Sequence, residues 1–402
     1  MGILRVKHLF PGLEQFRAYL NTASAGMLPL TSLKRVLDFL NYIIDFREGS
    51  DSVDVLDVKF LNKTLEEGAK LMKVKKENIG LTIQTTEGLR RILMALTPKE
   101  EMNIVSLDME FPSLSCLLKS YSEKHKLELR VVKNKNGWYS IEEIEKSIDD
   151  KTFAVVISSI QWISGQRIDL KELSKIVHEH GAWLIVDAVQ HLGSLTLFPK
   201  RERVDALVAG GEKWLLNPAV GSGLMYLSDE ILEELSPLPG LLNMEAPTGE
   251  WGLWWGIPEK NPWGDFVLRK DAKKMDFGGG PPYLLAVTLG ASLELINRLQ
   301  IEKIENHNKK LIARIRDEIL SAGLEVIGDH NEHEWSSIIT VKTGLGYEKE
   351  KKIYQKLLDE GIKISHRGVL GHYGLRISPH LYNDMDEVEI FLEHLFKNLV
   401  KL

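Results

Sequence analysis

The sequence predicts an α/β protein in which helices cover a mainly parallel sheet. From about Lys70 to Leu227, short apolar or β-branched runs alternate with amphipathic stretches of helical spacing. The last third of the chain changes to a mixed pattern. The 402 residues also exceed the roughly 100 to 200 of one usual domain. We therefore expect a large α/β domain over residues 16–285 and a small α+β domain over residues 286–402, which residues 1–15 join.

The expected strands of the large domain are short apolar or β-branched runs. They are Ile104–Leu107, Leu129–Val132, Phe153–Ile157, Trp183–Asp187 and Asp205–Ala209. One expected helix has Asp169 as its N-cap and stops at Gly181, and apolar residues recur on one of its faces, namely Leu170, Leu173, Ile176 and Val177. This alternation is typical of a parallel sheet.

The pattern changes after Pro282. A helix through residues 284–293 leads into a second helix. The chain then reads as strand, helix, two strands and a final helix, near residues 338–341, 348–360, 362–364, 375–378 and 384–399. The preceding segment, Pro237–Pro282, fits neither pattern and contains many Gly and Pro residues together with Trp251, Trp254, Trp255 and Trp263. A loop this long is usually functional or disordered, and tryptophans argue against disorder. We expect it to cover a site or a subunit interface.

Composition excludes several classes of function. Lys and Arg number 51 against 57 Asp and Glu, and the resulting charge of -6 is too mild for a nucleic-acid-binding surface. No uncharged run approaches the roughly 18 apolar residues of a membrane span. The first eight residues lack the apolar stretch of a signal peptide, and the single cysteine cannot form an internal disulfide. We expect a cytoplasmic protein that acts on a small molecule.

Two residues at strand ends indicate the chemistry. Asp187 ends an almost wholly apolar strand, and ligands of parallel sheets bind at the carboxyl ends of strands. Lys213 follows the next expected strand through Gly210 and Gly211, which allow a sharp turn and close approach to a ligand. Each has a plain structural alternative, a helix cap or salt bridge for Asp187 and a solvated side chain for Lys213. Their combination favours a shared site.

The combination suits pyridoxal phosphate (PLP). This cofactor needs a lysine amine to anchor it, a carboxylate to keep its pyridine nitrogen protonated and an anion site for its phosphate. Thr85 and Thr86 open an expected helix with Leu89, Ile92, Leu93 and Leu96 on one face, so their hydroxyls and the free amides of the first turn form such an anion site. An ordinary capped helix is the alternative.

With these residues in place, the chain resembles the class V aminotransferase family of fold-type I PLP enzymes, which includes cysteine desulfurases, kynureninases and isopenicillin-N-epimerase-like proteins. Short stretches spread over nearly the whole chain support the resemblance. They are Tyr19–Ser24, Thr85–Glu87, Glu110–Ser113, Ser164–Leu170, Asp187–Gln190, Glu212–Trp214 and Leu375–Asn383.

The resemblance implies roles around the cofactor ring. Lys213 would form the covalent link and move protons, and Asp187 would pair with the pyridine nitrogen. Gln190 would donate a hydrogen bond to the ring hydroxylate, and Phe111 would stack on the ring, where many relatives have His. Gln161 would also touch the ring.

Further roles concern the phosphate and the substrate. Arg376 matches the clamp for the substrate carboxylate, with Asn21 expected beside it; a surface charge or an ion pair with Asp384 is the alternative for Arg376. Gly280 lies in Gly278–Pro281, which replaces a Gly-Thr-Pro pattern whose hydroxyl reaches the phosphate across the subunit interface in relatives, so only its backbone amides remain here. The resemblance also implies a homodimer.

Two departures qualify the resemblance. Glu212 stands where relatives often have His or Tyr near the phosphate, and its carboxylate would repel the phosphate unless it were turned away or protonated. A desulfurase needs a thiolate just before the clamp arginine, but residues 366–374 contain no cysteine. We expect Cys116 to be a buried, inert thiol in a helix. Cysteine desulfuration is therefore disfavoured.

The expected activity is amino-group transfer on an amino-acid substrate. The alternatives are a PLP-dependent epimerase or racemase, a β-lyase, and, from another class, a non-catalytic PLP-binding regulatory protein. We expect no metal site, because the pairs His178/His180 and His330/His333 have no cysteine or acid constellation around them and are expected to be solvated.

Overall fold

The core of the computed structural model, which describes residues 3–218, 221–328 and 331–400, is a seven-stranded sheet. Its order is β2-β8-β7-β6-β5-β3-β4, and β8 runs antiparallel to its neighbours β2 and β7, whereas all the other neighbouring pairs are parallel. The strands are β2 (Ile79–Thr82), β3 (Asn103–Leu107), β4 (Glu128–Val132), β5 (Thr152–Ser158), β6 (Trp183–Asp187), β7 (Ala206–Gly210) and β8 (Gly223–Leu227). The prediction of a mainly parallel α/β sheet is confirmed.

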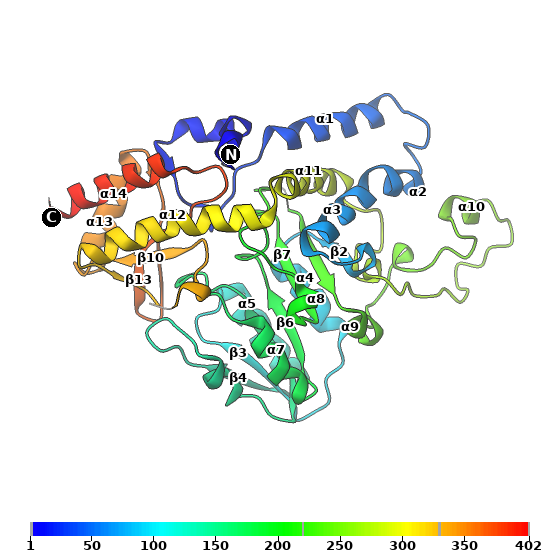
Figure 1. Ribbon diagram of the computed structural model, residues 1–402. Coiled ribbons are helices and arrows are strands. Elements are labelled where there is room, and N and C mark those ends of the chain that lie inside the picture. Colours follow the sequence, from blue (N-terminus) through cyan, green and yellow to red (C-terminus); the bar gives the residue numbers. More distant parts are fainter. Residues whose placement is uncertain (1–2, 219–220, 329–330, 401–402) are drawn as a thin grey trace.

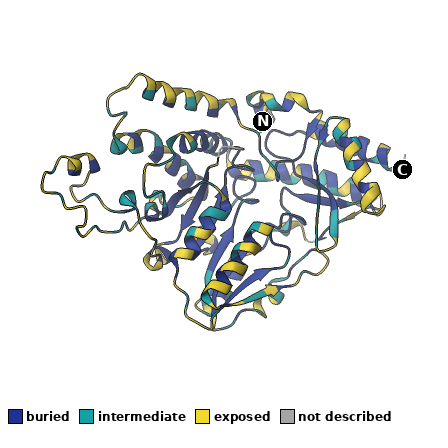
Figure 2. Ribbon diagram, turned by 180° about the vertical axis from the view of Figure 1, so that it is seen from behind, coloured by how far each residue is buried: buried dark blue, intermediate teal, exposed yellow. Residues whose placement is uncertain are grey.

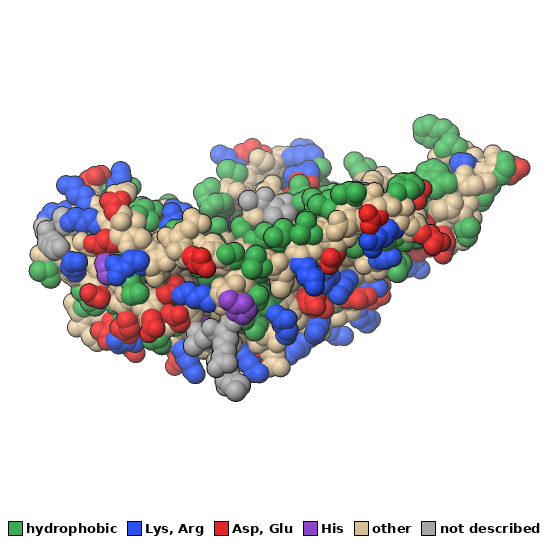
Figure 3. All heavy atoms as spheres, turned by 90° about the horizontal axis from the view of Figure 1, so that it is seen from above, with side chains coloured by type: hydrophobic (Ala, Val, Ile, Leu, Met, Phe, Trp, Pro, Cys, Tyr) green, Lys and Arg blue, Asp and Glu red, His purple; other side chains and the backbone are tan. Residues whose placement is uncertain are grey.

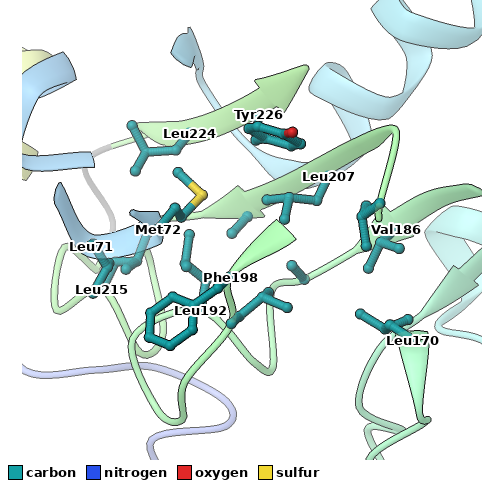
Figure 4. Packing of buried hydrophobic residues seen from close by; sticks show 14 of the residues in the cluster. Leu71, Met72, Leu170, Val186, Leu192, Phe198, Leu207, Leu215, Leu224 and Tyr226 are labelled. Carbon is teal, nitrogen blue, oxygen red and sulfur yellow. The ribbon is translucent and has the colours of Figure 1, made fainter. Parts of the chain in front are cut away.

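Both faces of this sheet are buried (Figure 2). Along β6, Leu184 and Val186 join one hydrophobic cluster and Ile185 joins the other, because successive side chains of a strand point to opposite faces. Figure 4 shows the first cluster, to which Leu71 and Met72 of α3 and Val186, Leu207 and Leu224 of three neighbouring strands contribute. Burial on both faces explains why these strands read as continuous apolar runs.

Helices cover the two faces of the sheet (Figure 1). They are α3 (Asn62–Met72), α4 (Thr85–Ala95), α5 (Pro112–His125), α6 (Ile141–Glu145), α7 (Leu170–Glu179), α8 (Pro199–Glu202), α9 (Asp229–Glu234) and α11 (Tyr283–Leu299). In α7, the Asp169 side chain accepts a hydrogen bond from Glu172 N at 2.9 Å, so the predicted N-cap is confirmed. Above α11 lies α1 (Leu30–Ile44), followed by the short α2 (Val53–Leu56).

A second sheet occupies the C-terminal part of the molecule, in the order β12-β13-β10-β9. Its strands are β9 (Glu325–Val326), β10 (Ile339–Lys342), β12 (Ser365–Val369) and β13 (His372–Ile377), and α12 (Ile301–Ser321), α13 (Tyr347–Asp359) and α14 (Met385–Val400) pack with it. Near the N-terminus, β1 (Ala18–Tyr19) pairs in parallel with β11 (Ile362–Lys363). The C-terminal part of the chain therefore pairs with the N-terminal segment. The division into two domains at residue 285 stays a prediction.

The tryptophan-rich segment 237–282 forms an arm that projects from the body (Figure 1). It contains α10 (Trp251–Trp255), and its backbone is held by Asp54 of α2, whose carboxylate accepts from Gly252 N at 2.9 Å. Trp251 and Trp254 are buried, whereas Trp263 is 91% exposed. Because the arm packs on α2, it does not cover the predicted site within the single chain. Its role at a subunit interface stays a prediction.

By length and composition, no described helix could cross a membrane by itself. The pair α11 and α12 passes such a test only when the two are taken together across a bend of 79°.

Candidate active site

The predicted site residues meet at the carboxyl edge of the large sheet. Phe111 follows β3, Gln161 follows β5, Asp187 ends β6 and Lys213 follows β7. Since these strands are parallel neighbours, their carboxyl ends lie at one edge of the sheet, and the region around these four side chains is called the crevice below. The register places Asp187 directly beside Ser158 at the end of β5 and Val208 of β7.

Lys213 is partly buried, with an aromatic ring near its amine and a neighbouring segment against its backbone. Its Nζ lies 5.6 Å from the centroid of the Phe111 ring. The N-terminal segment approaches closely from the other side, where Gly26 N donates to Glu212 O at 2.9 Å and a Cβ on Gly26 would collide with Lys213 O. Desolvation lowers the pKa of Lys213, against the opposing charges of Glu212 and Asp187. A lysine of this kind is easily deprotonated to a nucleophilic amine.

Asp187 is a buried carboxyl without a salt bridge among the described residues. It is 7% exposed and accepts a hydrogen bond from Val189 N at 3.0 Å. Burial raises its pKa to about 6, although the Val189 bond and the charge of Lys213 oppose the shift. A protonated ring nitrogen beside it would supply the missing positive charge.

Gln190 holds the N-terminal segment to the site. Its Nε2 donates to Ala23 O at 3.0 Å, and its Oε1 accepts from Trp214 Nε1 at 2.8 Å. The acceptor atom is thus occupied, while the amide nitrogen keeps a second hydrogen. The donor role predicted for Gln190 requires that hydrogen.

Arg376 connects the small sheet to the cofactor side of the crevice. It is 2% exposed, and its Nη1 donates to Trp162 O at 2.9 Å while the Trp162 ring meets Phe111 edge-on at 5.5 Å. The alternative partner, Asp384, instead contacts Lys7. Arg376 Nε is buried and has no partner within the described chain.

The start of α4 is open to an anion. Thr85 and Thr86 are the first two residues of this helix, whose N-cap Gln84 makes no side-chain capping bond. Thr85 Oγ1 accepts from Gly210 N at 2.9 Å, which ties the helix to the end of β7. The Glu212 side chain lies against Gly210 and leaves no room there for a Cβ. Glu212 therefore sits close to this end, and an anion would require its carboxylate to turn away or take a proton.

The sequence matches the family described as Aminotransferase class-V over residues 18–391, a span that includes this whole crevice. The chain belongs to the class-V aminotransferase family.

Members of the class-V family with different names resemble the chain. A probable cysteine desulfurase of Methanothermobacter thermautotrophicus is 25% identical over 394 residues, which cover 94% of this chain and 93% of the relative. An uncharacterized aminotransferase of Bacillus subtilis is 22% identical over 329 residues, 82% of this chain and 81% of the relative.

A solved structure has the same fold. It is a mutant of C-DES with glycine covalently linked to its PLP cofactor, and it superposes with a TM-score of 0.82 at 20% identity, over 97% of this chain and 98% of that one. The PLP fold-type I architecture is thereby confirmed, and at this level of identity the likeness concerns the fold alone.

Two predicted site residues lie in different surroundings. Asn21 is buried beside the small sheet, where its Oδ1 accepts from Ser365 Oγ at 2.5 Å and its backbone bridges to Ser378. Gly280 is exposed, and a Cβ added there would meet no atom within 4 Å. In the single chain, Gly280 thus faces open space, and its predicted role at the cofactor stays a prediction.

Sequence reasoning missed Glu110, which precedes Phe111. This buried carboxyl accepts from Ser158 N at 2.8 Å, from the Ser158 hydroxyl, and from Gln161 Nε2 at 3.4 Å. Burial raises its pKa to about 7, and the nearby charge of Asp187 adds to the shift. Gln161 is oriented by this contact, and its own Oε1 is buried without a partner in the described chain.

Sequence reasoning also assigned no role to Ser24, on which two arginines converge. Arg376 Nη2 and Arg367 Nη2 donate to its hydroxyl oxygen at 2.7 and 3.3 Å. Both Glu110 and Ser24 belong to stretches that supported the family resemblance, so their position in those stretches was the available signal.

The expectation of a buried Cys116 is wrong. The residue is exposed on α5. Leu114 and Leu118 fill the buried side of that helix, and at 100° per residue Cys116 points about 200° away from each of them.

The expectation of solvated histidines is also wrong for His178 and His180. Both are partly buried and hydrogen-bonded to acids, His178 Nε2 to Asp205 at 2.9 Å and His180 Nδ1 to Asp150 at 2.7 Å. His333 is exposed, and His330 lies outside the described residues. Within the described ranges no three His, Cys, Asp or Glu residues are grouped as a metal site.

Proposed function

We propose that the protein is a PLP-dependent aminotransferase that acts on an amino acid. The observation that supports this most is the convergence of a desolvated lysine, a buried unpaired carboxyl and a buried unpaired arginine on one crevice. PLP supplies, when bound, an electron sink that stabilises negative charge at the substrate Cα. The residues of this chain decide how the cofactor and the substrate lie.

Each predicted residue has a separate task in this proposal. Lys213 would hold the cofactor covalently, and its free amine would serve as the base for the Cα proton of the bound substrate. Asp187 keeps the ring nitrogen protonated. Because the Asp187 carboxylate is buried, its negative charge is stabilised best by a cation beside it, and the protonated ring nitrogen is such a cation. The open first turn of α4 with Thr85 and Thr86 holds the phosphate, and Arg376 binds the substrate carboxylate.

Persulfide transfer finds less support, although several curated relatives are named cysteine desulfurases or probable cysteine desulfurases. The segment before Arg376 runs from β12 into β13 as a tight hairpin without cysteine, and Cys116 lies on α5. Racemisation and β-elimination need the same lysine and the same clamp, so the products of the reaction must separate them from transamination.

We also propose that the active form is a cytoplasmic homodimer. One face of α1 carries Leu33, Leu37 and Ile44, which are 51, 49 and 76% exposed, while Phe39 and Tyr42 on its other face are buried. Figure 3 looks onto this side of the molecule and shows hydrophobic side chains gathered across it. An exposed apolar stripe of this kind is typical of a subunit interface.

The test begins with the cofactor. The protein reconstituted with PLP should absorb visible light, and borohydride reduction followed by peptide mapping should place the pyridoxyl group on Lys213. Lys213→Ala should abolish the covalent adduct, whereas Lys126→Ala, at an exposed lysine, should leave it unchanged. A pyridoxyl group on another lysine contradicts the assignment.

A screen of amino acids then identifies the reaction. Transamination yields a keto acid and the aminated cofactor, racemisation yields the opposite enantiomer, and β-elimination releases the side-chain substituent. Absence of any product or spectral change with every amino acid favours the non-catalytic PLP-binding alternative.

A further inference from the structure

Two guanidinium groups face the crevice side by side. Arg376 on β13 and Arg367 on β12 belong to antiparallel neighbours, and both donate to Ser24 Oγ. Each arginine also donates a hydrogen bond to a backbone carbonyl, Arg376 to Trp162 O at 2.9 Å and Arg367 to His366 O at 3.2 Å. Ser24 is neutral, so the shared contact compensates neither charge.

Neither arginine has a carboxylate within 4.0 Å among residues 3–218, 221–328 and 331–400. Arg376 is buried with an unpartnered Nε, and its pKa falls to about 9, first through burial and then through the charge of Arg367. Buried cations without an anion are costly, and such groups concentrate at binding sites. The pair is therefore stabilised by whatever anion enters the crevice.

A carboxylate held in the fork of Arg376 leaves Arg367 without an anion of its own. Arg367 and Arg376 both act on the charge of Lys213, so the three cations share one space. The acids Asp187 and Glu212 lie at the cofactor end, on the loops after β6 and β7. A bidentate α-carboxylate on Arg376 occupies one guanidinium fork and leaves the half-buried Arg367 with only neutral partners.

We propose that Arg367 binds a second carboxylate, so that the substrate is an amino acid with an acidic side chain. The inference rests on the proposed function for the role of Arg376, and it makes Arg367 the residue that selects the side chain. The competing arrangement, in which both arginines hold the same carboxylate, predicts a different response to substitution of Arg367.

Binding of unreactive acids to the PLP-loaded protein tests the proposal without turnover. Titration calorimetry compares succinate with butyrate and glutarate with valerate, pairs of equal chain length that differ by one carboxylate. The wild type should bind at least one diacid tenfold or more tighter than its monoacid. Arg367→Gln should weaken that diacid about 10- to 100-fold and change the monoacid less than about twofold.

Matched variants make the result specific. Arg376→Lys should weaken monoacid and diacid alike, because it loses the fork that both need. Lys342→Gln, which removes one charge from an exposed ion pair of the same sheet, should change neither. If Arg367→Gln does not fold by circular dichroism, Arg367→Lys replaces it and should lose part of the diacid preference.

Two results overturn the proposal: equal affinity of the wild type for diacid and monoacid, or an equal loss of both in the Arg367 variant. The second result means that the arginines share one carboxylate. Steady-state rates then compare aspartate with asparagine and glutamate with glutamine, and an acid preference should disappear in Arg367→Gln. If no amino acid reacts while the diacid preference holds, the proposed reaction fails and the binding site stands.

Discussion

Burial dominates the ionisation of the side chains around Lys213. The pKa of Asp187 rises to about 6 and that of Glu110 to about 7, and desolvation is the largest cause in both. The same effect lowers the pKa of Lys213. Asp187 and Glu110 are therefore weaker acids than usual, and Lys213 is a weaker base. At neutral pH a bound cation or anion can change the protonation of these groups at a small cost in free energy.

Asp187→Asn should leave the cofactor bound but slow turnover. A neutral amide cannot stabilise a protonated ring nitrogen, so the loss should be a few kcal/mol in barrier lowering, roughly a thousandfold in rate. Single-turnover kinetics with the best substrate of the screen provide the measurement. Rates within about threefold of the wild type would contradict the role, and the visible spectrum serves as the control for cofactor occupancy.

Glu110→Gln should change how stability depends on pH. The folded pKa of Glu110, about 7, exceeds its usual value of 4.5, so its contribution is present below pH 4.5 and is lost as the pH rises through about 7. The variant lacks this loss. The difference between its free energy of unfolding and that of the wild type should therefore rise in favour of the variant by roughly 1–3 kcal/mol from pH 5 to pH 8.

Urea unfolding of the cofactor-free proteins at several pH values measures this difference. Glu145→Gln, at an exposed position on α6, is the matched control and should follow the wild type. A constant difference between Glu110→Gln and wild type across this pH range would show that Glu110 is ionised in the folded protein like an ordinary surface acid.

The helices and strands place these groups through their ends and faces. Glu110, Asp187 and Lys213 all lie where β3, β6 and β7 end or just beyond, so a parallel sheet alone brings them together. Helix faces matter equally. In α5 the face with Leu114 and Leu118 is buried, and this orientation directs Cys116 outward.

Cys116→Ser should keep activity within about twofold, and cysteine should yield no sulfide that depends on this residue. The physical reason is that α5 presents the thiol on its exposed side, while the segment before Arg376 contains none. Sulfide and persulfide assays with cysteine as substrate decide the point. Sulfide release by the wild type that vanishes in Cys116→Ser would restore the desulfurase interpretation.

At the scale of the whole molecule, the surface around α1 carries exposed apolar side chains. The stripe on α1 lies on the side of the molecule from which the tryptophan-rich arm projects, and the arm is tied to α2 next to it. Together they form a surface long enough for a second copy of the chain.

Leu37→Glu should convert the dimer into monomers. The charge would have to be buried unpaired in the interface, which costs several kcal/mol. Light scattering after gel filtration should show the mass of two chains for the wild type and of one, 45.6 kDa, for the variant. Leu320→Glu, at a 40% exposed leucine on α12, should remain dimeric. A monomeric wild type would contradict the proposal.

The sequence predicted much of the fold, because strand burial and helix faces leave periodic patterns. The strands β3 to β7 and the capped helix α7 begin and end within a few residues of their predicted bounds. The prediction for Cys116 was wrong because it ignored which face of the helix carries the residue. The prediction for His178 was wrong because its hydrogen-bond partner, Asp205, is distant in the sequence.

By itself, the sequence determined the sheet and the placement of Asp187 and Lys213 on it, because local periodicity sets the strands and chain direction sets which end a residue occupies. Only the tertiary structure decided that Ser24 meets Arg376, 352 residues later, and that Glu110 lies beside Asp187. Those neighbours are joined by packing between separate elements. Desolvation and charge depend on what surrounds a side chain in space, and one-dimensional patterns do not contain that information.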